Sequence, residues 1–341
     1  MSRQSHVALL AIALALGCAG IIPQAEVEPP AVAAPFDYAE AASRVARRKS
    51  LEDSVVVRGL GSILLTHGQR TPRVYVLLHG FTDVPTQFEV VGKALFNDGA
   101  NVYIPRLPHH GERLAPVRAL GRVHSDELAA FGDSSVDIAR GLGDSVVVVG
   151  LSAGGAIAGW IAQTRADVRR AVLIAPAIAA GRVSDDDALA LIMIASRLPD
   201  VRRTNAPTDT TNPEYLQGIS TRGLAEVLKL GRRVRDAAEE KPPGVKDIAF
   251  LLSELDQTVS EAASFDLAQR GFDRGAAVSV FRFPNSVGLP HNIMEVRARG
   301  GNPDVAFPVV EALARSLTPP STAELQPVPC RGWRCTLRRL R

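Results

Sequence analysis

The fold of this chain is decided by the stretch VVVVGLSAGGAIAGW, residues 146–160. Four successive valines predict a strand that is buried on both faces, as in a parallel sheet. The alanines and glycines from Gly154 to Thr164 predict a helix that packs closely beneath that strand. Ser152 stands between them in a Gly-x-Ser-x-Gly pattern, which favours a nucleophile elbow, a tight turn that raises the serine hydroxyl above the sheet. The alternative is that Ser152 is only a small residue that permits close packing.

Strands and helices alternate along most of the chain. Further strands are predicted by the apolar runs RVYVLLHG (73–80), RRAVLIAPAI (169–178), DIAFLLSELD (247–256) and AVSVFRF (277–283). Strand and helix repeated at this spacing predict an α/β fold, with a mostly parallel central sheet that is flanked by helices. Because functional side chains of such sheets gather beyond the carboxyl ends of the strands, we looked for chemistry at those positions.

Length and charge limit the class of protein. The 341 residues exceed the usual size of one domain, but a single α/β domain with an insertion fills that length. The formal net charge is only +3, without a sustained basic face, so nucleic acid is not an expected partner. The expected segments are a signal peptide (1–18), a tether and lead-in (19–50), a first core part (51–179), a helical lid (180–246), a second core part (247–318) and a basic tail (319–341).

A lone serine hydroxyl is a poor nucleophile and needs a base and an oriented acid. His291 lies in the loop between the strand at 277–283 and the last helix, and it is the expected base. A surface histidine is the alternative reading of that residue. Asp256 directly follows an apolar strand and is the expected acid, with Glu254, nearer to the strand, as the competing carboxylate.

Backbone N–H groups are expected to form an oxyanion hole. Ala153 opens the helix after the serine, so its N–H lies where the helix dipole favours negative charge. The loop after VYVLLHG is the expected source of the second donor, the N–H of Phe81, and Gly80 is expected to permit an unusual backbone there. His79 ends a buried run and is interpreted as a structural residue that holds this loop.

Two adjacent histidines, His109 and His110, stand in another strand-end loop and are expected to border the site. Adjacent side chains project in different directions, and no carboxylate cluster accompanies these two. We therefore expect no metal site, and the chemistry of a serine with a base needs no cofactor.

The interval 180–246 carries two amphipathic helical stretches, 185–198 and 223–240. We expect them to form a lid, with Ile192, Met193 and Ile194 facing an acyl-binding pocket. Two surface helices of the main domain are the alternative. Tyr215 is expected either in that pocket or in the core.

Five short motifs occur in this order: LLHGFTDVPTQF, YIPRLPHHGER, GLSAGG, ELDQTVS and GLPHNIM. Together they resemble the α/β-hydrolase superfamily, in particular bacterial carboxylesterases and monoacylglycerol-lipase-like enzymes, over residues 62–317. The resemblance implies the α/β-hydrolase fold, with Ser152 as nucleophile, Asp256 as acid and His291 as base, in the chain order that this superfamily uses. It also implies the oxyanion donors named above. HHG replaces the usual GHG, so the substrate of any one relative does not transfer.

The first residues are typical of an export signal. Arg3 precedes an apolar run, 7–16, that is too short to span a bilayer. The run ends in LALGC, which resembles the lipobox of bacterial lipoproteins, so Cys18 is the expected lipidation site. Cleavage without lipidation and an uncleaved anchor are the alternatives. The protein is thus expected to be exported and held on a membrane.

Cysteine usage agrees with export. In an oxidising compartment Cys330 and Cys335 could close a small disulfide loop, or they remain two unpaired thiols. Neither is expected to take part in chemistry.

The sequence as a whole predicts a serine hydrolase that cleaves acylglycerol or medium-chain acyl esters through an acyl-enzyme on Ser152. Its expected partners are the small-molecule ester and, through Cys18, a membrane. Thioesterase, amidase or perhydrolase chemistry on the same residues, and a non-catalytic binding module, are the alternatives. Fold alone does not separate these activities.

Overall fold

The computed structural model describes residues 34–181, 194, 200–204, 218–294, 302–316 and 326–327. By its contacts the chain divides into residues 1–34 and 35–341, and every element named here belongs to the second unit. Cys18, Cys330 and Cys335 lie outside the described residues, so lipidation and the disulfide stay predictions.

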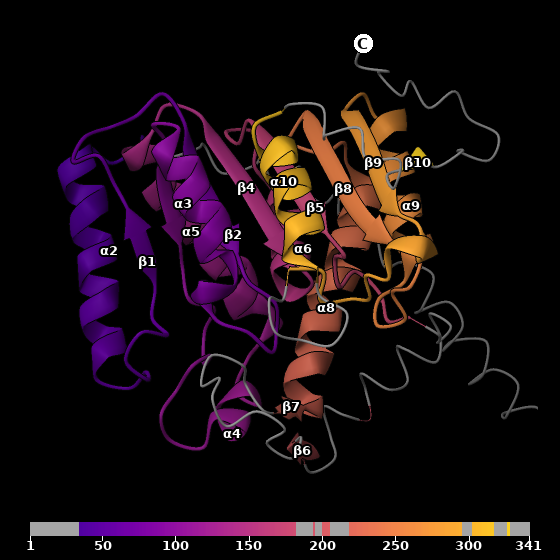
Figure 1. The fold of residues 1–341 in the computed structure, drawn as a ribbon, viewed down its shortest axis with the longest axis horizontal. Helices are drawn as coiled ribbons and strands as arrows, with labels where there is room; N and C mark the ends of the chain where they lie inside the picture. The colour runs from indigo at the N-terminus through magenta and orange to yellow at the C-terminus, as the bar shows by residue number, and fades with distance from the viewer. Residues whose placement is uncertain are drawn as a thin grey trace, which may run out of the picture. The chain divides into compact units, whose positions relative to one another are not determined.

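The described strands form one eight-stranded sheet and a separate two-stranded ribbon (Figure 1). The order across the sheet is β1 (Ile63–Leu65), β3 (Asn101–Ile104), β2 (Val74–Leu78), β4 (Val146–Leu151), β5 (Arg170–Ile174), β8 (Asp247–Ser253), β9 (Ala277–Phe283) and β10 (Gln326–Pro327). The neighbours from β3 to β9 are parallel, and the edge strands β1 and β10 are antiparallel. Every residue of β2, β3, β4 and β5 is buried, as the continuous apolar runs predict.

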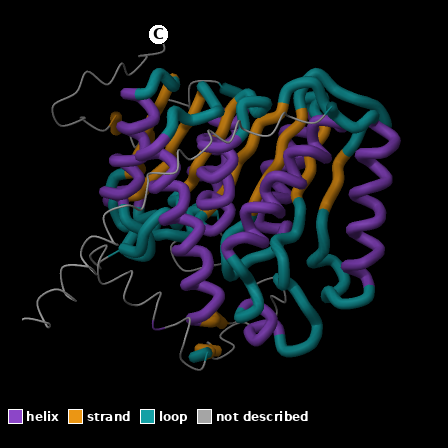
Figure 2. Tube along the Cα trace, turned by 180° about the vertical axis from the view of Figure 1, so that it is seen from behind, coloured by secondary structure: helices purple, strands orange, loops and turns teal. Residues whose placement is uncertain are grey.

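Helices cover both faces of the sheet (Figures 1 and 2). On one face, in front in Figure 1, α3 (Glu89–Asn97) contacts α10 (Pro303–Ala314). On the other face the contacts run in order through α2 (Tyr38–Asp53), α5 (Ser125–Leu142), α6 (Ala153–Thr164), α8 (Thr221–Glu240) and α9 (Glu261–Asp273). Short elements complete the described part: η1 (Pro85–Phe88), α4 (Pro116–Leu120), η2 (Asn285–Val287) and the ribbon of β6 (Arg202–Thr204) and β7 (Gly218–Ser220). Within the described residues, no helix has both the length and the apolar character needed to cross a membrane.

The strand register brings the ends of the central strands to one edge. Leu78 at the end of β2 pairs with Gly150 in β4, and Leu151 pairs with Ile174 at the end of β5. On the far side of β5, β8 and β9 also end together. The loops after β2, β4, β8 and β9 therefore meet at the same edge, which is where the predicted site residues stand.

The structure corrects part of the lid prediction. The second predicted lid stretch, 223–240, belongs to α8, which packs on α6 and α5 as a helix of the covering layer and buries Val227, Leu230 and Val234. This agrees with the alternative of a main-domain helix, because the apolar stripe of α8 is turned toward the sheet layer. Ile194 is 50% exposed and so is not enclosed in a pocket.

Much of the remaining lid interval lies outside the described residues. Ile192, Met193 and Tyr215 are among these, so their roles stay predictions. Of the described part, the ribbon β6–β7 contacts α4, and the first turn of α8 follows β7 directly.

Candidate active site

Ser152 occupies a strained turn between β4 and α6. Its backbone angles, φ 54° and ψ −111°, lie in a region that residues with a side chain rarely adopt. Three backbone hydrogen bonds of 2.9 Å hold it: its N–H donates to the carbonyl of Ile174, and its own carbonyl accepts from the N–H groups of Ala156 and Ala177. The neighbouring strand and helix therefore impose the conformation that an elbow requires.

The glycines of the motif are needed because backbone segments touch at the turn. A Cβ on Gly150 would lie 2.1 Å from the carbonyl oxygen of Gly154, and one on Gly154 would lie 2.0 Å from that of Leu78. A Cβ on Gly155 would lie 2.8 Å from the Cα of Pro176. Real Cβ atoms do not approach backbone this closely, so larger residues would displace the serine.

Three side chains that are far apart in sequence form a hydrogen-bonded triad at this edge. His291 Nε2 lies 2.8 Å from Ser152 Oγ, and His291 Nδ1 lies 2.7 Å from Asp256 Oδ2. The side chains of His291 and Asp256 are only 13% and 4% exposed. A neutral imidazole with its proton on Nδ1 donates to the carboxylate and accepts from the serine hydroxyl, which is the orientation a general base needs.

The carboxylate of Asp256 is fixed by its own loop. Its second oxygen, Oδ1, accepts hydrogen bonds from the backbone N–H groups of Thr258 at 2.8 Å and Val259 at 3.2 Å. These donors leave Oδ2 free to face His291. The carboxyl group is thereby oriented before any substrate arrives.

The competing carboxylate, Glu254, has other partners. It forms an ion pair with Arg282 at 2.6 Å and accepts the backbone N–H of Asn285 at 2.9 Å. Between the two candidates, the structure brings Asp256 to His291 and turns Glu254 to the neighbouring strand.

The loop that carries His291 is anchored on both sides. Ser253 Oγ donates a hydrogen bond to the carbonyl of Leu289, whose side chain is fully buried. Gly288 turns the chain with φ 74°, and the N–H of Ile293 donates to the carbonyl of His291 at 3.0 Å. β8 thus supplies both the acid loop and the serine that holds the base loop.

The loop after β2 lies against the nucleophile. A Cβ on Gly80 would lie 3.8 Å from Ser152 Cβ, an ordinary contact. The N–H of Gly80 donates to Gln87 Oε1 at 2.9 Å, and Gln87 Nε2 donates to Asp83 Oδ2 at 2.7 Å. Gly80 does not have a positive φ, so the expectation of an unusual, glycine-dependent backbone there is not met. What shapes this loop is the polar pair of Asp83 and Gln87, which sequence reasoning missed although the two stand four residues apart.

The two expected oxyanion donors have no competing acceptor. Within the described part of the chain, neither the N–H of Phe81 nor that of Ala153 donates a hydrogen bond. Ala153 is the first residue of α6, where backbone N–H groups have no acceptor inside the helix. Both groups are available to a substrate oxygen.

The buried histidine at the end of β2 is fully used by backbone groups. His79 Nε2 accepts the N–H of Leu107 at 3.0 Å, and its Nδ1 donates to the carbonyl of Gly80 at 2.9 Å. Burial, together with the neighbouring His110, holds the pKa of the His79 imidazole well below its usual range. The ring is therefore neutral, and it ties the β2 loop to the β3 loop.

The adjacent pair separates, as expected from its geometry. His109, with φ 65°, points its ring toward Glu112 at 3.4 Å and Glu127 at 3.2 Å. His110 is fully buried and lies against Phe81, with ring centroids 5.5 Å apart. Of the two, only His110 is in contact with the oxyanion loop. No group of three or more potential metal ligands occurs among the described residues.

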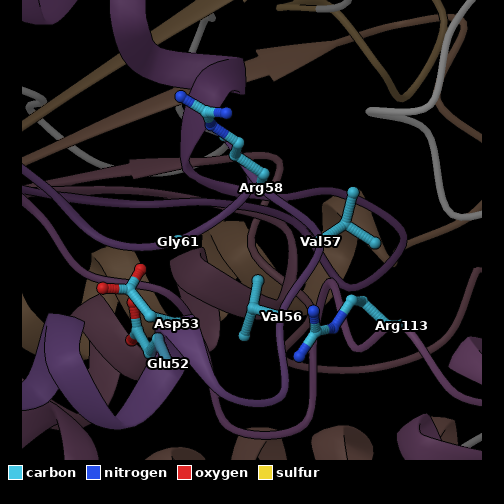
Figure 3. A pocket seen from close by; sticks show the side chains of 8 residues that line it. Glu52, Asp53, Val56, Val57, Arg58, Gly61 and Arg113 are labelled. Atoms are coloured by element: carbon cyan, nitrogen blue, oxygen red, sulfur yellow. The ribbon is translucent and has the colours of Figure 1, made fainter.

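Two cavities lie away from the triad. One of about 330 Å³ lies at the end of α2, where Figure 3 shows Glu52 and Asp53 on one side and Arg58 and Arg113 around the rest. The other, of about 590 Å³, lies between α2 and α5 and is lined in part by His109. Neither is lined by a triad residue, so neither is the cavity that would receive an ester at the serine.

Comparison with known proteins agrees with this architecture. Residues 75–330 match the Alpha/beta hydrolase family. A monoacylglycerol lipase of Paleococcus ferrophilus is 17% identical, with a TM-score of 0.58, over 75% of this chain and 98% of that one. A thermostable carboxyl esterase from Bacillus coagulans is 15% identical, with a TM-score of 0.56, over 75% and 92%. A structure from the metagenome-derived lipolytic enzymes LipS and LipT is 16% identical, with a TM-score of 0.57, over 76% and 99%.

A comparison with curated proteins finds no match. At the identities of the solved structures the likeness is one of fold, and it confirms the fold predicted from the five motifs.

Proposed function

Because the chain belongs to the alpha/beta hydrolase family, we propose that it hydrolyses carboxylic esters through an acyl-enzyme on Ser152. The observation that carries this proposal is the hydrogen-bonded line from Ser152 Oγ through His291 to Asp256. A binding module has no use for a serine held in a strained turn beside a base. The fold neighbours include esterases and lipases, which supports ester hydrolysis over other reactions of the same fold.

The reaction follows from the positions of these groups. Ser152 Oγ attacks the ester carbonyl carbon while His291 Nε2 takes its proton, and Asp256 stabilises the imidazolium. The carbonyl oxygen becomes an oxyanion and accepts hydrogen bonds from the N–H groups of Phe81 and Ala153, each of which contributes about 3 kcal/mol to lowering the barrier. His291 returns the proton to the leaving alcohol, and a water that it deprotonates then hydrolyses the acyl-enzyme.

The substrate class proposed is acylglycerols or similar medium-chain acyl esters. The proposal draws on the motif resemblance and on the lipases and esterases among the fold neighbours. We also place the protein outside the cytoplasm, anchored through a lipidated Cys18, on the basis of the N-terminal sequence. The mass of the mature N-terminus tests this: a diacylglyceryl-modified cysteine is expected, and an unmodified or uncleaved N-terminus contradicts it.

The decisive experiment is labelling of the purified protein with a fluorophosphonate probe, combined with a p-nitrophenyl ester series of increasing chain length. Ser152→Ala should abolish both labelling and turnover. Ser54→Ala, which removes an exposed hydroxyl bonded only to the carbonyl of Leu51, is the matched control and should change neither. Labelling without ester turnover, but with thioester or amide turnover, would redirect the proposal to those reactions. A wild-type protein that neither labels nor turns over any ester would favour the binding module.

A further inference from the structure

Two buried histidines hold the two successive carbonyls of the oxyanion loop. His79 Nδ1 lies 2.9 Å from the carbonyl oxygen of Gly80, and His110 Nε2 lies 2.7 Å from that of Phe81. The structure assigns to His110 the role of a positioning residue for the oxyanion hole: by holding the Phe81 carbonyl it aims the Phe81 N–H at the reacting carbonyl. This inference rests on the ester hydrolysis proposed above.

The covalent geometry of the loop gives the first argument. The Gly80 carbonyl and the Phe81 N–H belong to one planar peptide group, in which the two point in opposite directions. The Phe81 carbonyl belongs to the next peptide group. The two soft dihedral angles of Phe81 connect these planes, so holding both carbonyls fixes the direction of the N–H between them. His79 alone holds only the first plane.

The ring of Phe81 is enclosed as well. The His110 ring meets it edge to face, with an interplanar angle of 81°, and a Cβ on Gly223 at the start of α8 would come within 2.8 Å of its tip. The side chain thus lies between His110 and α8. Backbone and side chain of Phe81 are both held, which is the pre-organisation that an oxyanion donor needs.

His110 is itself held from the far side by charged groups. Arg106 Nη1 donates to the carbonyl of His110 at 2.7 Å, and Arg106 Nε lies 3.3 Å from Oε1 of the buried Glu52 in α2. Glu52 in turn accepts the N–H of Ser62 at 2.6 Å and its hydroxyl at 2.8 Å. A continuous line of contacts therefore runs from α2 to the oxyanion loop, through residues that the hydrolysis itself does not use.

The protonation of His110 makes the inference sharp. Burial lowers the pKa of its imidazole to about 4, so the ring is neutral near pH 7 and carries one N–H. Both ring nitrogens face carbonyl oxygens, Nδ1 that of Pro108 at 2.8 Å and Nε2 that of Phe81 at 2.7 Å. Only one of them can receive the hydrogen bond. The inference requires the proton on Nε2, and the shorter of the two distances agrees with that.

Two conservative variants separate the two contacts. The amide of Asn reaches about as far as Nδ1, whereas the amide of Gln reaches about as far as Nε2 and can donate to the Phe81 carbonyl. His110→Asn should lower kcat by roughly tenfold to a hundredfold, with KM little changed, because a misplaced donor acts on the transition state. His110→Gln should recover most of kcat. His67→Asn, at an exposed histidine stacked on Phe96, is the matched control and should match the wild type.

Binding of a trifluoromethyl ketone, which forms a tetrahedral adduct on the serine, should weaken in His110→Asn in parallel with kcat/KM. Equal loss in the Asn and Gln variants, or wild-type kcat in His110→Asn, would overturn the inference. If the Asn variant fails to fold, ¹⁵N NMR of the wild-type imidazole decides: a proton on Nε2 supports the inference, and one on Nδ1 overturns it. A wild type without ester turnover refutes the proposed function instead, while the NMR result still reads the His110 contact.

Discussion

Replacing Asp256 by Asn tests the orientation of the triad with almost no change in shape. Oδ1 of Asp256 accepts the N–H groups of Thr258 and Val259, so the oxygen of an Asn must take that place. Its NH₂ group then replaces Oδ2 and faces His291 Nδ1 from 2.7 Å. Two donors cannot face each other at that distance, so the imidazole must move its proton to Nε2. In that tautomer the ring donates toward Ser152 and cannot take its proton.

The expected loss in kcat is about 10⁴-fold, the magnitude that a wrong tautomer produces in a serine hydrolase triad, or about 5 kcal/mol. The assay is steady-state hydrolysis of the best p-nitrophenyl ester, with the rate of fluorophosphonate labelling as a second measure. The free energy of unfolding should change little, because the two backbone hydrogen bonds to the loop remain.

Glu254→Gln is the matched control for this variant. It removes the ion pair with Arg282 but leaves an oxygen for the N–H of Asn285. Its kcat should stay near that of the wild type. If Asp256→Asn keeps more than a tenth of the activity, or if Glu254→Gln loses as much, the assignment of the acid is wrong and Glu254 reaches the base in solution.

Two further predictions concern stability. Gly154→Ala places a Cβ 2.0 Å from the carbonyl oxygen of Leu78 and should lower the free energy of unfolding by about 3 kcal/mol or more, whereas Gly80→Ala, whose nearest contact is 3.7 Å, should lower it far less; urea denaturation compares them, and equal losses would contradict the steric argument. The buried, neutral His79 and His110 have folded-state pKa values below those of the unfolded chain, so stability is full above about pH 6.5 and falls as the pH drops from there toward 4, by roughly 1 kcal/mol per pH unit for each ring. His110→Gln removes one of these groups, and an unchanged slope in urea titrations at several pH values would count against its neutral state.

The parts of the site that were predictable share a local cause. At the elbow, the glycines are required because their neighbours lie within a few residues or in the strand alongside, and the pattern is visible in nine residues of sequence. The central strands were predictable because a strand buried on both faces must be apolar throughout. Asp256 and His291 were predictable as candidates because parallel strands end at one edge, so residues that follow different strands meet there.

By itself, then, the sequence determined the fold class, the elbow and the short set of side chains able to serve as acid and base. Only the tertiary structure decided between Asp256 and Glu254, assigned α8 to the covering layer, and joined His110 to Phe81 across the loops after β2 and β3. The reason is physical: an amphipathic helix has the same pattern whether it covers a sheet or a pocket, and the partner of a carboxylate or an imidazole depends on which loops the packing brings within hydrogen-bond distance.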